Sequence, residues 1–186
     1  MHHDVRIRRL RTAELTDPEV RHLRAMLVAA FHDPAEPEEA FSVEDWHHAL
    51  GGVHVLADVD GEIVAHASVV ERELRVGGRP LRTGYVEAVA TARDAWGRGF
   101  GTSVMMEIAT IIRDRHELGA LGTGAQHFYE RLGWRAWPGP TAVRTATGEE
   151  RTPDADGYVL VLRTPTTPAL DEGATISCDW RGGDVW

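Results

Sequence analysis

The chain lacks the features that mark several large classes of protein. Its 186 residues include a single cysteine, Cys178, so no disulfide can form within the chain, and no neighbouring histidine suggests a nucleophilic thiol. No apolar run approaches the ~20 residues of a membrane span, and Met1-His2-His3 lacks the apolar core of a signal peptide. We therefore expect a cytoplasmic protein, with no membrane partner, in which Cys178 is a small buried residue.

Metal-ligand spacings and an excess of basic charge are also missing. The ten histidines contain no HExxH or comparable motif, and His2-His3 and His47-His48 fit a solvated terminus and one helix face. Twenty basic residues stand against 29 acidic ones, for a formal net charge of −9, so the summed field repels nucleic acid and attracts cations. We expect no metal site and no nucleic-acid partner. A polycationic small molecule would suit the charge.

Length and patterning predict one α+β domain. The 186 residues, 42% of them hydrophobic, are enough to bury one core, whereas two full domains would be cramped. We therefore expect a single domain over residues 1–186. The strands outnumber the helices and do not alternate strictly with them, which favours an α+β or mixed α/β sheet over a doubly wound one.

Periodicity and turn signals place the elements. Capping boxes at 16–19 and 42–45 predict two helices, the second of which ends at Leu50. Asp60-Gly61 and Gly77-Gly78 predict two chain reversals between strands. The predicted strands are 5–10, 54–59, 63–70, 81–90, 118–122 and 158–162, two later helices begin at Phe100 and Ala125, and 163–173 is a linker with two prolines.

A glycine-rich stretch, Ala95-Trp96-Gly97-Arg98-Gly99-Phe100-Gly101-Thr102, follows the strand 81–90 and opens a helix. Glycines leave backbone N–H groups unobstructed, so several can converge on one anion at the positive end of that helix. We interpret the stretch as a pyrophosphate-binding loop. No Lys-Ser/Thr pair follows the last glycine, and the spacing fits neither a P-loop nor a dinucleotide fingerprint. Alone, the pattern is equally consistent with a tight connection into an ordinary amphipathic helix.

A second segment, Ala125-Gln126-His127-Phe128-Tyr129-Glu130-Arg131-Leu132-Gly133-Trp134, resembles the Tyr-Glu-x-x-Gly-Phe/Trp helix end of the GNAT N-acetyltransferases. The resemblance implies a central, mostly antiparallel mixed sheet flanked by helices, acetyl-CoA as the acetyl donor, and a homodimer. The chain departs from this superfamily at Trp96, where Gln or Arg usually precedes the glycines. The residues that the resemblance assigns to coenzyme A are Val89, Trp96, Gly97, Arg98, Gly99, Gly101 and Thr102.

Three further segments are similar to the aminoglycoside 2′-N-acetyltransferase family. They are Glu44-Asp45-Trp46-His47-His48-Ala49-Leu50-Gly51-Gly52, Gly84-Tyr85-Val86-Glu87-Ala88-Val89-Ala90 and Cys178-Asp179-Trp180-Arg181-Gly182-Gly183-Asp184-Val185-Trp186. The likeness extends over about residues 5–186 and is most specific in the last nine. It implies acetylation of the 2′-amino group of an aminoglycoside or aminocyclitol antibiotic, which confers resistance, with residues 163–186 completing the acceptor site.

Acetyl transfer to an amine sets chemical requirements that the resemblance assigns to particular residues. A sugar amine is largely protonated near neutral pH, so a positioned carboxylate must take its proton, directly or through water. The resemblance makes Glu87 this base, Tyr129 the proton donor to the departing thiolate, and the Val89 N–H the donor to the thioester oxygen on a strand that splays from its neighbour. Without the resemblance, we would interpret Glu87 as an exposed strand carboxylate and Tyr129 as a packing residue.

The acceptor site implied by the resemblance is rich in carboxylates. Asp45, Asp184 and Trp186 match the family, whereas Ala40 and Ala155 stand where relatives acting on deoxystreptamine antibiotics carry aspartates. Fewer carboxylates favour a substrate with fewer amino groups, such as kasugamycin, unless neighbouring acids compensate. Those neighbours are Glu38, Glu39, Asp154 and Asp156, and the implied acceptor site also includes Glu87, Ala88 and Gly122. Two alternatives stay open: acetylation of another small-molecule or peptide amine, and a non-catalytic module that binds coenzyme A or a drug.

Overall fold

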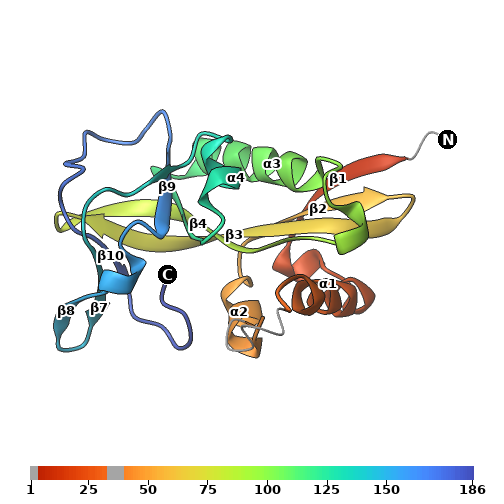
Figure 1. Ribbon diagram of the computed structural model, residues 1–186, viewed down its shortest axis with the longest axis horizontal. Coiled ribbons are helices and arrows are strands. Elements are labelled where there is room, and N and C mark those ends of the chain that lie inside the picture. Colours follow the sequence, from red (N-terminus) through yellow and green to blue (C-terminus); the bar gives the residue numbers. More distant parts are fainter. Residues whose placement is uncertain (1–3, 33–39) are drawn as a thin grey trace. The chain divides into compact units, whose positions relative to one another are not determined.

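The computed structural model describes residues 4–32 and 40–186 (Figure 1). The chain forms two compact units, each made from two stretches of sequence. The first unit is Met1–Val70 with Val86–Ile108, and the second is Glu71–Tyr85 with Ala109–Trp186. No helix in the described ranges is long and apolar enough to cross a membrane.

The first unit contains a three-stranded antiparallel ladder. β1 (Val5–Arg11) pairs with β2 (Val53–Val59), which pairs with the first part of β3 (Glu62–Val76). Asp60 (φ 53°) and Gly61 (φ 88°) form the tight turn between β2 and β3, which confirms the predicted reversal. The register shifts between Ala57 and Asp58, so that Val64 is an extra residue in β3.

Two helices of the first unit begin where their capping boxes predict. α1 (Asp17–Ala30) is capped by Thr16, and α2 (Val43–His48) is capped by Ser42 and ends two residues before the expected Leu50. Figure 1 shows α1 lying along one face of β2 and β3. The core there is apolar, with members from both helices, from β2 and β3, and from a further strand that contains residue 90: Leu23, Met26, Leu27, Trp46, Leu56, Ile63 and Ala90.

The glycine-rich loop connects β4 (Arg79–Thr91) to α3 (Phe100–Arg115). The strand was expected to run directly into this loop, but a short 3-10 turn, η3 (Arg93–Ala95), lies between them. A similar turn, η1 (Thr12–Glu14), follows β1. The apolar side chains that repeat at helical spacing along α3, namely Phe100, Val104, Ile108 and Ile111, are all buried.

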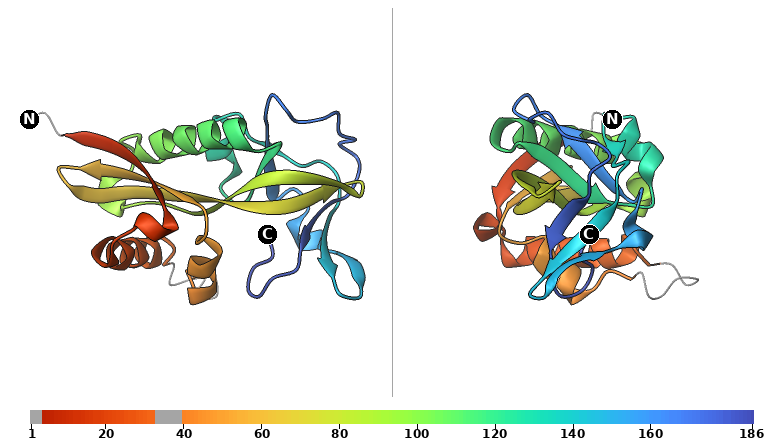
Figure 2. Two further views of the ribbon diagram at one scale, coloured as in Figure 1. Left: turned by 180° about the vertical axis from the view of Figure 1, so that it is seen from behind. Right: turned by 90° about the vertical axis from the view of Figure 1, so that its left-hand side faces the viewer.

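The second unit contains two ladders. In one, β5 (Leu118–Gly122) pairs in parallel with β4 and antiparallel with β9 (Val159–Arg163), and β6 (Arg135–Ala136) pairs with the far side of β9. In the other, β10 (Ile176–Asp179) pairs with the end of β3 and, in parallel, with β7 (Thr141–Thr145), which forms a hairpin with β8 (Gly148–Arg151) (Figure 2). The helices α4 (Gln126–Glu130) and η4 (Pro153–Ala155) lie in the connections.

The sheet as a whole is mixed and mostly antiparallel. Its strands are hydrogen-bonded in the order β6-β9-β5-β4-β3-β10-β7-β8, with β2 and β1 following from β3. Among the described strands, β4 with β5 and β7 with β10 run in parallel. The pairs β1–β2, β2–β3, β3–β10, β5–β9, β6–β9 and β7–β8 run antiparallel. The predicted α+β class is confirmed, whereas β6, β7, β8 and β10 were not predicted.

Candidate active site

The glycine-rich loop presents open backbone at the start of α3. Gly97 (φ +74°) and Gly99 (φ +87°) adopt the left-handed conformation, and a Cβ at either would meet no atom within 4 Å. Ser103 N–H donates to Gly99 O at 3.0 Å, so the N–H groups of 100–102 precede the first helical hydrogen bond. Such an arrangement, at the positive end of a 16-residue helix, fits the pyrophosphate of coenzyme A.

Trp96 cannot replace the side-chain donor that the superfamily usually carries at its position. Its indole N–H, the one donor of that side chain, already donates to Thr91 O at 2.7 Å. The Arg93 guanidinium lies 5.9 Å from the centre of the Trp96 ring, and Trp96 is 59% exposed. The other donors of this stretch are the backbone N–H groups, the Thr102 hydroxyl and the exposed Arg98, whose guanidinium lies 5.0 Å from the Phe100 ring.

Strand β4 bends at Ala88, between the two residues expected to take part in acetyl transfer. Ala88 has φ 52°, a left-handed conformation that costs an L-residue roughly 1–2 kcal/mol. Glu87 and Val89 on either side are half-buried. The carbonyl of Glu87 accepts from Ser68 Oγ at 3.2 Å, and that of Ala88 accepts from His66 Nδ1 at 2.7 Å. Side chains of β3 therefore hold both carbonyls of the bend.

The ladder between β4 and β5 is short. Its pairs run from Thr83 with Leu118 to Tyr85 with Ala120, while β4 continues to Thr91. By contrast, β5 pairs with β9 along its whole length, from Leu118 to Gly122. The pairing of β4 with β5 therefore stops at Tyr85, although β4 continues for six more residues. This is the arrangement expected if β4 splays away from β5.

Tyr129 lies in α4 and is nearly buried. Its exposed fraction is 8%, and burial raises the pKa of its hydroxyl above the usual value, with a further increase from Tyr158. The ring contacts Phe128 and Trp134 edge-on, with ring centres 4.9 and 6.4 Å away. The hydroxyl therefore stays protonated near neutral pH, the state that a proton donor needs.

The C-terminal residues pack against other residues of the second unit, to which they belong. Trp186 is 5% exposed, and its indole N–H donates to Thr152 Oγ1 at 3.0 Å. The carbonyl of Val185 accepts from Arg72 Nη2 at 3.0 Å and from the buried Cys178 Sγ at 3.3 Å. A Cβ on Gly122 would come within 3.1 Å of the Trp186 carbonyl carbon, so glycine there permits this close approach. The tail is an ordered part of the fold.

The acidic side chains expected at the acceptor site are in different states. Asp156 Oδ1 accepts from Thr141 N at 2.8 Å and Oγ1 at 2.9 Å, and its Oδ2 accepts from Arg151 at 2.7 Å. The bond from the Thr141 backbone N–H is the largest cause of a lowered Asp156 pKa. Asp154 and Asp184 are exposed, and Asp184 accepts from Trp186 N at 3.2 Å. Asp156 therefore joins β7 to η4, whereas Asp154 and Asp184 face solvent.

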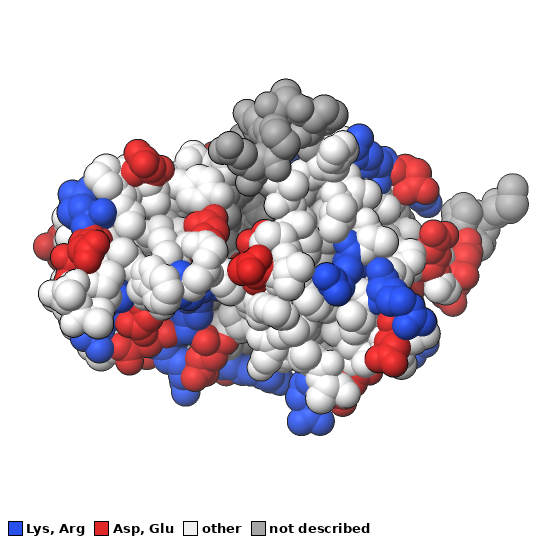
Figure 3. Space-filling model, turned by 90° about the horizontal axis from the view of Figure 1, so that it is seen from below, with Lys and Arg blue, Asp and Glu red and all other residues white. Residues whose placement is uncertain are grey.

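Asp45 also has a structural partner. Its Oδ2 accepts from Ser42 N at 2.7 Å and from Ser42 Oγ at 2.8 Å, which completes the capping box of α2. Glu38 and Glu39 lie outside the described residues, and Ala40 is exposed. Figure 3 shows acidic and basic side chains interspersed on the face that it presents, so on that face the net charge forms no single acidic surface. Recognition of a cation there would depend on individual carboxylates.

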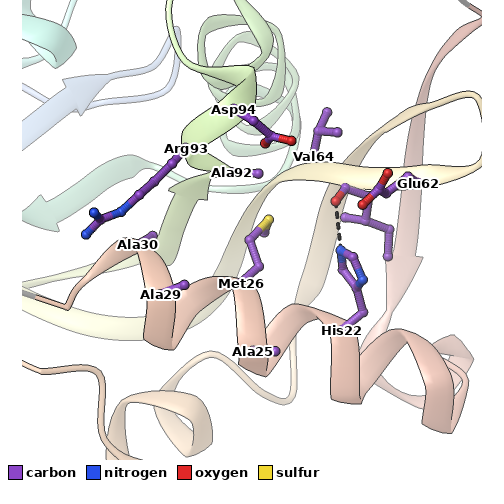
Figure 4. Close-up of a pocket in the computed structure, with 11 residues that line it drawn as sticks. His22, Ala25, Met26, Ala29, Ala30, Glu62, Val64, Ala92, Arg93 and Asp94 are labelled. Atoms are coloured by element: carbon purple, nitrogen blue, oxygen red, sulfur yellow. Dashed lines mark hydrogen bonds between the residues drawn. The ribbon is translucent and has the colours of Figure 1, made fainter.

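A cavity of about 340 Å³ lies in the first unit, away from the residues expected from the sequence (Figure 4). It is bounded by α1, by the start of β3 and by residues 92–94. His22 crosses one end, where its Nε2 lies 2.9 Å from Ile63 O. The cavity contains none of the residues expected to bind coenzyme A or an amine.

Sequence reasoning missed a buried polar chain behind the bend of β4. His54 and His66 have no exposed surface, their rings lie 5.2 Å apart, and their nitrogens are within 2.9 Å. A hairpin with uniform register from the Asp60-Gly61 turn would put the two histidines on opposite faces, because each strand position alternates sides. The bulge at Val64 puts both histidines on the same face of the sheet. The sequence contains no pattern from which this bulge could be predicted.

Comparisons with known proteins agree with the geometry. A family model described as an acetyltransferase (GNAT) domain matches residues 11–137. An aminoglycoside 2′-N-acetyltransferase from Mycolicibacterium fortuitum is 41% identical over 183 residues, which is 96% of this chain and 91% of that protein.

Solved structures of low sequence identity share the fold. A GNAT family acetyltransferase from Brucella melitensis in complex with acetyl-CoA has a TM-score of 0.58 at 19% identity, covering 91% of this chain and 95% of that one. YhbS, a GNAT family N-acetyltransferase from Escherichia coli in complex with CoA, has a TM-score of 0.61 at 15% identity, covering 95% and 89%.

Proposed function

Since the chain belongs to the aminoglycoside 2′-N-acetyltransferase family of the GNAT superfamily, we propose that it acetylates the 2′-amino group of an aminoglycoside antibiotic and so confers resistance. The chain is an N-acetyltransferase with acetyl-CoA as its donor. The main support for the proposal is that the 41% identity extends over 96% of the chain. The general GNAT match ends at residue 137, but the likeness to the aminoglycoside enzyme covers 96% of the chain and so includes most of the region that docks the tail.

The glycine-rich loop is assigned to the coenzyme. Bound acetyl-CoA supplies the acetyl thioester. The N–H groups at the start of α3 hold the pyrophosphate, Gly97 and Gly99 let it approach the backbone, and Arg98 adds a positive charge. The Trp96 ring, exposed beside Arg93, contributes an apolar face and no hydrogen bond.

Glu87 is assigned as the base. The backbone at the bend sets the direction in which the Glu87 side chain leaves the strand. This backbone is fixed in turn by the hydrogen bond from Ser68 Oγ to the Glu87 carbonyl. The Glu87 carboxylate takes the proton of the attacking amine directly or through one water. The Val89 N–H, on the other side of Ala88, donates to the oxygen on which negative charge develops.

Tyr129 is assigned as the proton donor to the departing thiolate. The nearly buried position of Tyr129 keeps the hydroxyl neutral, because burial raises its pKa. Contacts with Phe128 and Trp134 fix the direction of the ring. A neutral hydroxyl with a fixed direction can deliver its proton as the sulfur gains charge.

The acceptor's ammonium groups are assigned to Asp154 and Asp184. The bond between the Trp186 indole and Thr152 ties the tail to the residue that precedes η4, the turn that carries Asp154. Asp156 and Asp45 already serve β7 and the α2 cap, so they add less to this set than their position in the sequence suggests. A reduced set of carboxylates favours a kasugamycin-like acceptor.

The decisive experiment is a thiol-release assay with acetyl-CoA and a panel of kasugamycin, gentamicin, tobramycin and a peptide amine. We expect turnover with aminoglycosides, a higher kcat/KM for kasugamycin than for gentamicin or tobramycin, and an acetyl group on the antibiotic's target amine by mass spectrometry and NMR. Turnover with the peptide alone would replace the proposal with a different acceptor. Tight acetyl-CoA binding without turnover of any amine would indicate a non-catalytic module.

A further inference from the structure

A continuous line of hydrogen bonds crosses the interior of the first unit and ends at the bend of β4. Gly51 N–H donates to Thr12 Oγ1 at 2.9 Å, and Thr12 Oγ1 lies 2.9 Å from His54 Nε2. His54 Nδ1 lies 2.9 Å from His66 Nε2. His66 Nδ1 then lies 2.7 Å from Ala88 O.

The direction of every bond in this line follows from its last acceptor. A carbonyl oxygen can only accept, so His66 Nδ1 carries a proton and, in the neutral ring, its Nε2 accepts from His54 Nδ1. His54 Nε2 must then accept from the Thr12 hydroxyl, which in turn accepts from the Gly51 N–H. Burial lowers the pKa of His54 to about 4 and, together with the neighbouring His54, that of His66 to about 3. Both rings are therefore neutral at physiological pH, and every hydrogen-bonding atom in the line is satisfied.

The line is not a route for protons. It starts at the amide N–H of Gly51 and ends at the carbonyl oxygen of Ala88, and neither group exchanges a proton readily near neutral pH. Its effect must therefore be on the conformation of the residue at its end. Ala88 is one of two non-glycine residues with positive φ in the described part of the chain.

Peptide planarity connects that conformation to the chemistry. The carbonyl of Ala88 and the N–H of Val89 belong to one peptide plane and point in opposite directions. A side chain that fixes the Ala88 carbonyl therefore also fixes the direction of the Val89 N–H. Ser68 holds the preceding carbonyl, that of Glu87, in the same way.

We propose that His66, supported by His54 and Thr12, is a positioning residue for acetyl transfer. It holds the Ala88 carbonyl on the sheet side, so that the Val89 N–H points away from β3. The proposal rests on the role assigned above to the bend of β4. Thr12, at the partly exposed end of the line, donates to His54 Nε2 and so supports the tautomers that the Ala88 carbonyl requires.

Two substitutions at His66 separate positioning from packing. An asparagine amide can take the place of Nδ1, and a glutamine amide that of Nε2, so His66→Asn keeps a donor to Ala88 O whereas His66→Gln loses it. We expect His66→Gln to lower kcat about 10²-fold, because a reacting group displaced by about 1 Å costs this much. The KM for acetyl-CoA should change less than twofold, and His66→Asn should restore most of kcat.

His22→Asn is the matched control, because His22 also bonds a carbonyl of the first unit, Ile63 O, through Nε2, and lies outside the line. It should leave kcat unchanged. If His66→Gln does not fold, Thr12→Val and Thr12→Ser replace it, with several-fold loss of kcat expected only for the valine. Equal kcat in His66→Gln, His66→Asn and the wild type would overturn the proposal, as would equal losses in both variants.

A second measurement, amide hydrogen exchange, tests the role of His66 even if the acceptor proposed above is wrong. The kinetic comparison uses whichever amine of the panel the wild type acetylates best. If the wild type acetylates none of them, the amide hydrogen exchange of Val89 in the coenzyme-free protein decides. Exchange that changes in His66→Gln and recovers in His66→Asn supports positioning, and exchange that is unchanged in both refutes it.

Discussion

Ala88 shows how a single residue can hold a costly backbone conformation. Its left-handed φ of 52° is unfavourable for alanine, yet the hydrogen bonds from His66 and Ser68 hold the carbonyls on both sides. Glu87 could be selected from the sequence only because the surrounding segment resembles a known family. The bend itself could not be predicted, since alanine has no preference for positive φ and the residues that enforce it come from β3.

The first prediction at this scale concerns the base. Glu87→Gln keeps the size and the strand environment of the side chain but cannot accept a proton. We expect kcat to fall roughly 10²–10⁴-fold while the Kd for acetyl-CoA stays within twofold. Steady-state kinetics and isothermal titration calorimetry measure the two quantities. Near-normal turnover would remove Glu87 from the mechanism, and a parallel loss of coenzyme binding would give it a structural role.

At the scale of elements, the bulge in β3 explains why part of the site was invisible in the sequence. The turn at Asp60-Gly61 fixed the hairpin, but one extra residue, Val64, moved every later position of β3 to the other face. The missed strands have a different cause. β8 is exposed along its whole length, and β7 and β10 are only 5 and 4 residues long, so none shows a recognisable alternation.

A prediction for the loop before α3 uses its left-handed glycines. Gly99→Ala should cost roughly 1–2 kcal/mol of backbone strain and weaken acetyl-CoA binding, because relaxation of φ moves the N–H groups that follow. Gly124→Ala is the control, since Gly124 has no positive φ and open space around its Cβ position. Thermal melts and coenzyme titration compare the two. Equal coenzyme affinity in both variants would argue against phosphate binding by this loop.

The paired histidines of β2 and β3 predict a pH dependence of stability. Their pKa values fall from 6.5 in the unfolded chain to about 4 and about 3 in the fold, so between these limits the unfolded state binds more protons. The free energy of unfolding should therefore be unaffected by them above pH 6.5 and fall as the pH drops toward 4, by up to roughly 1 kcal/mol per pH unit for each histidine.

Urea unfolding between pH 5 and 7.5 measures this slope before most carboxylates are protonated. His66→Asn removes one titrating ring and should make the slope shallower. The control His22→Asn removes an exposed histidine. A slope that is equally steep in His66→Asn and in the wild type would show that other groups cause it.

On the scale of the whole molecule, much of the fold follows from local sequence signals, whereas the packing of the C-terminal tail in the second unit does not. The capping boxes, the two glycine turns and the helix after the glycine-rich loop all appear where the sequence predicts them. The tail is different, because its order depends on partners far away in sequence. Arg72 and Thr152 hold Val185 and Trp186, and neither contact has a signature in the sequence.

The last prediction tests whether this docked tail recognises the acceptor. Asp184 places a negative charge next to the buried Trp186, an arrangement suited to binding an aminated sugar. Deleting residues 183–186 removes this charge but also the hydrogen bonds of the tail with Arg72 and Thr152, so the unfolding free energy should fall as well. Asp184→Asn separates the two effects, because this exposed side chain can lose its charge while Trp186 stays packed. Both variants should raise KM for the antibiotic, the deletion more strongly, and leave the Kd for acetyl-CoA nearly unchanged.

Glu149→Gln, on the exposed strand β8, is the control for general loss of negative charge. If KM for the antibiotic is the same in Asp184→Asn, Glu149→Gln and the wild type, and the deletion lowers stability alone, the tail closes the fold without binding the substrate.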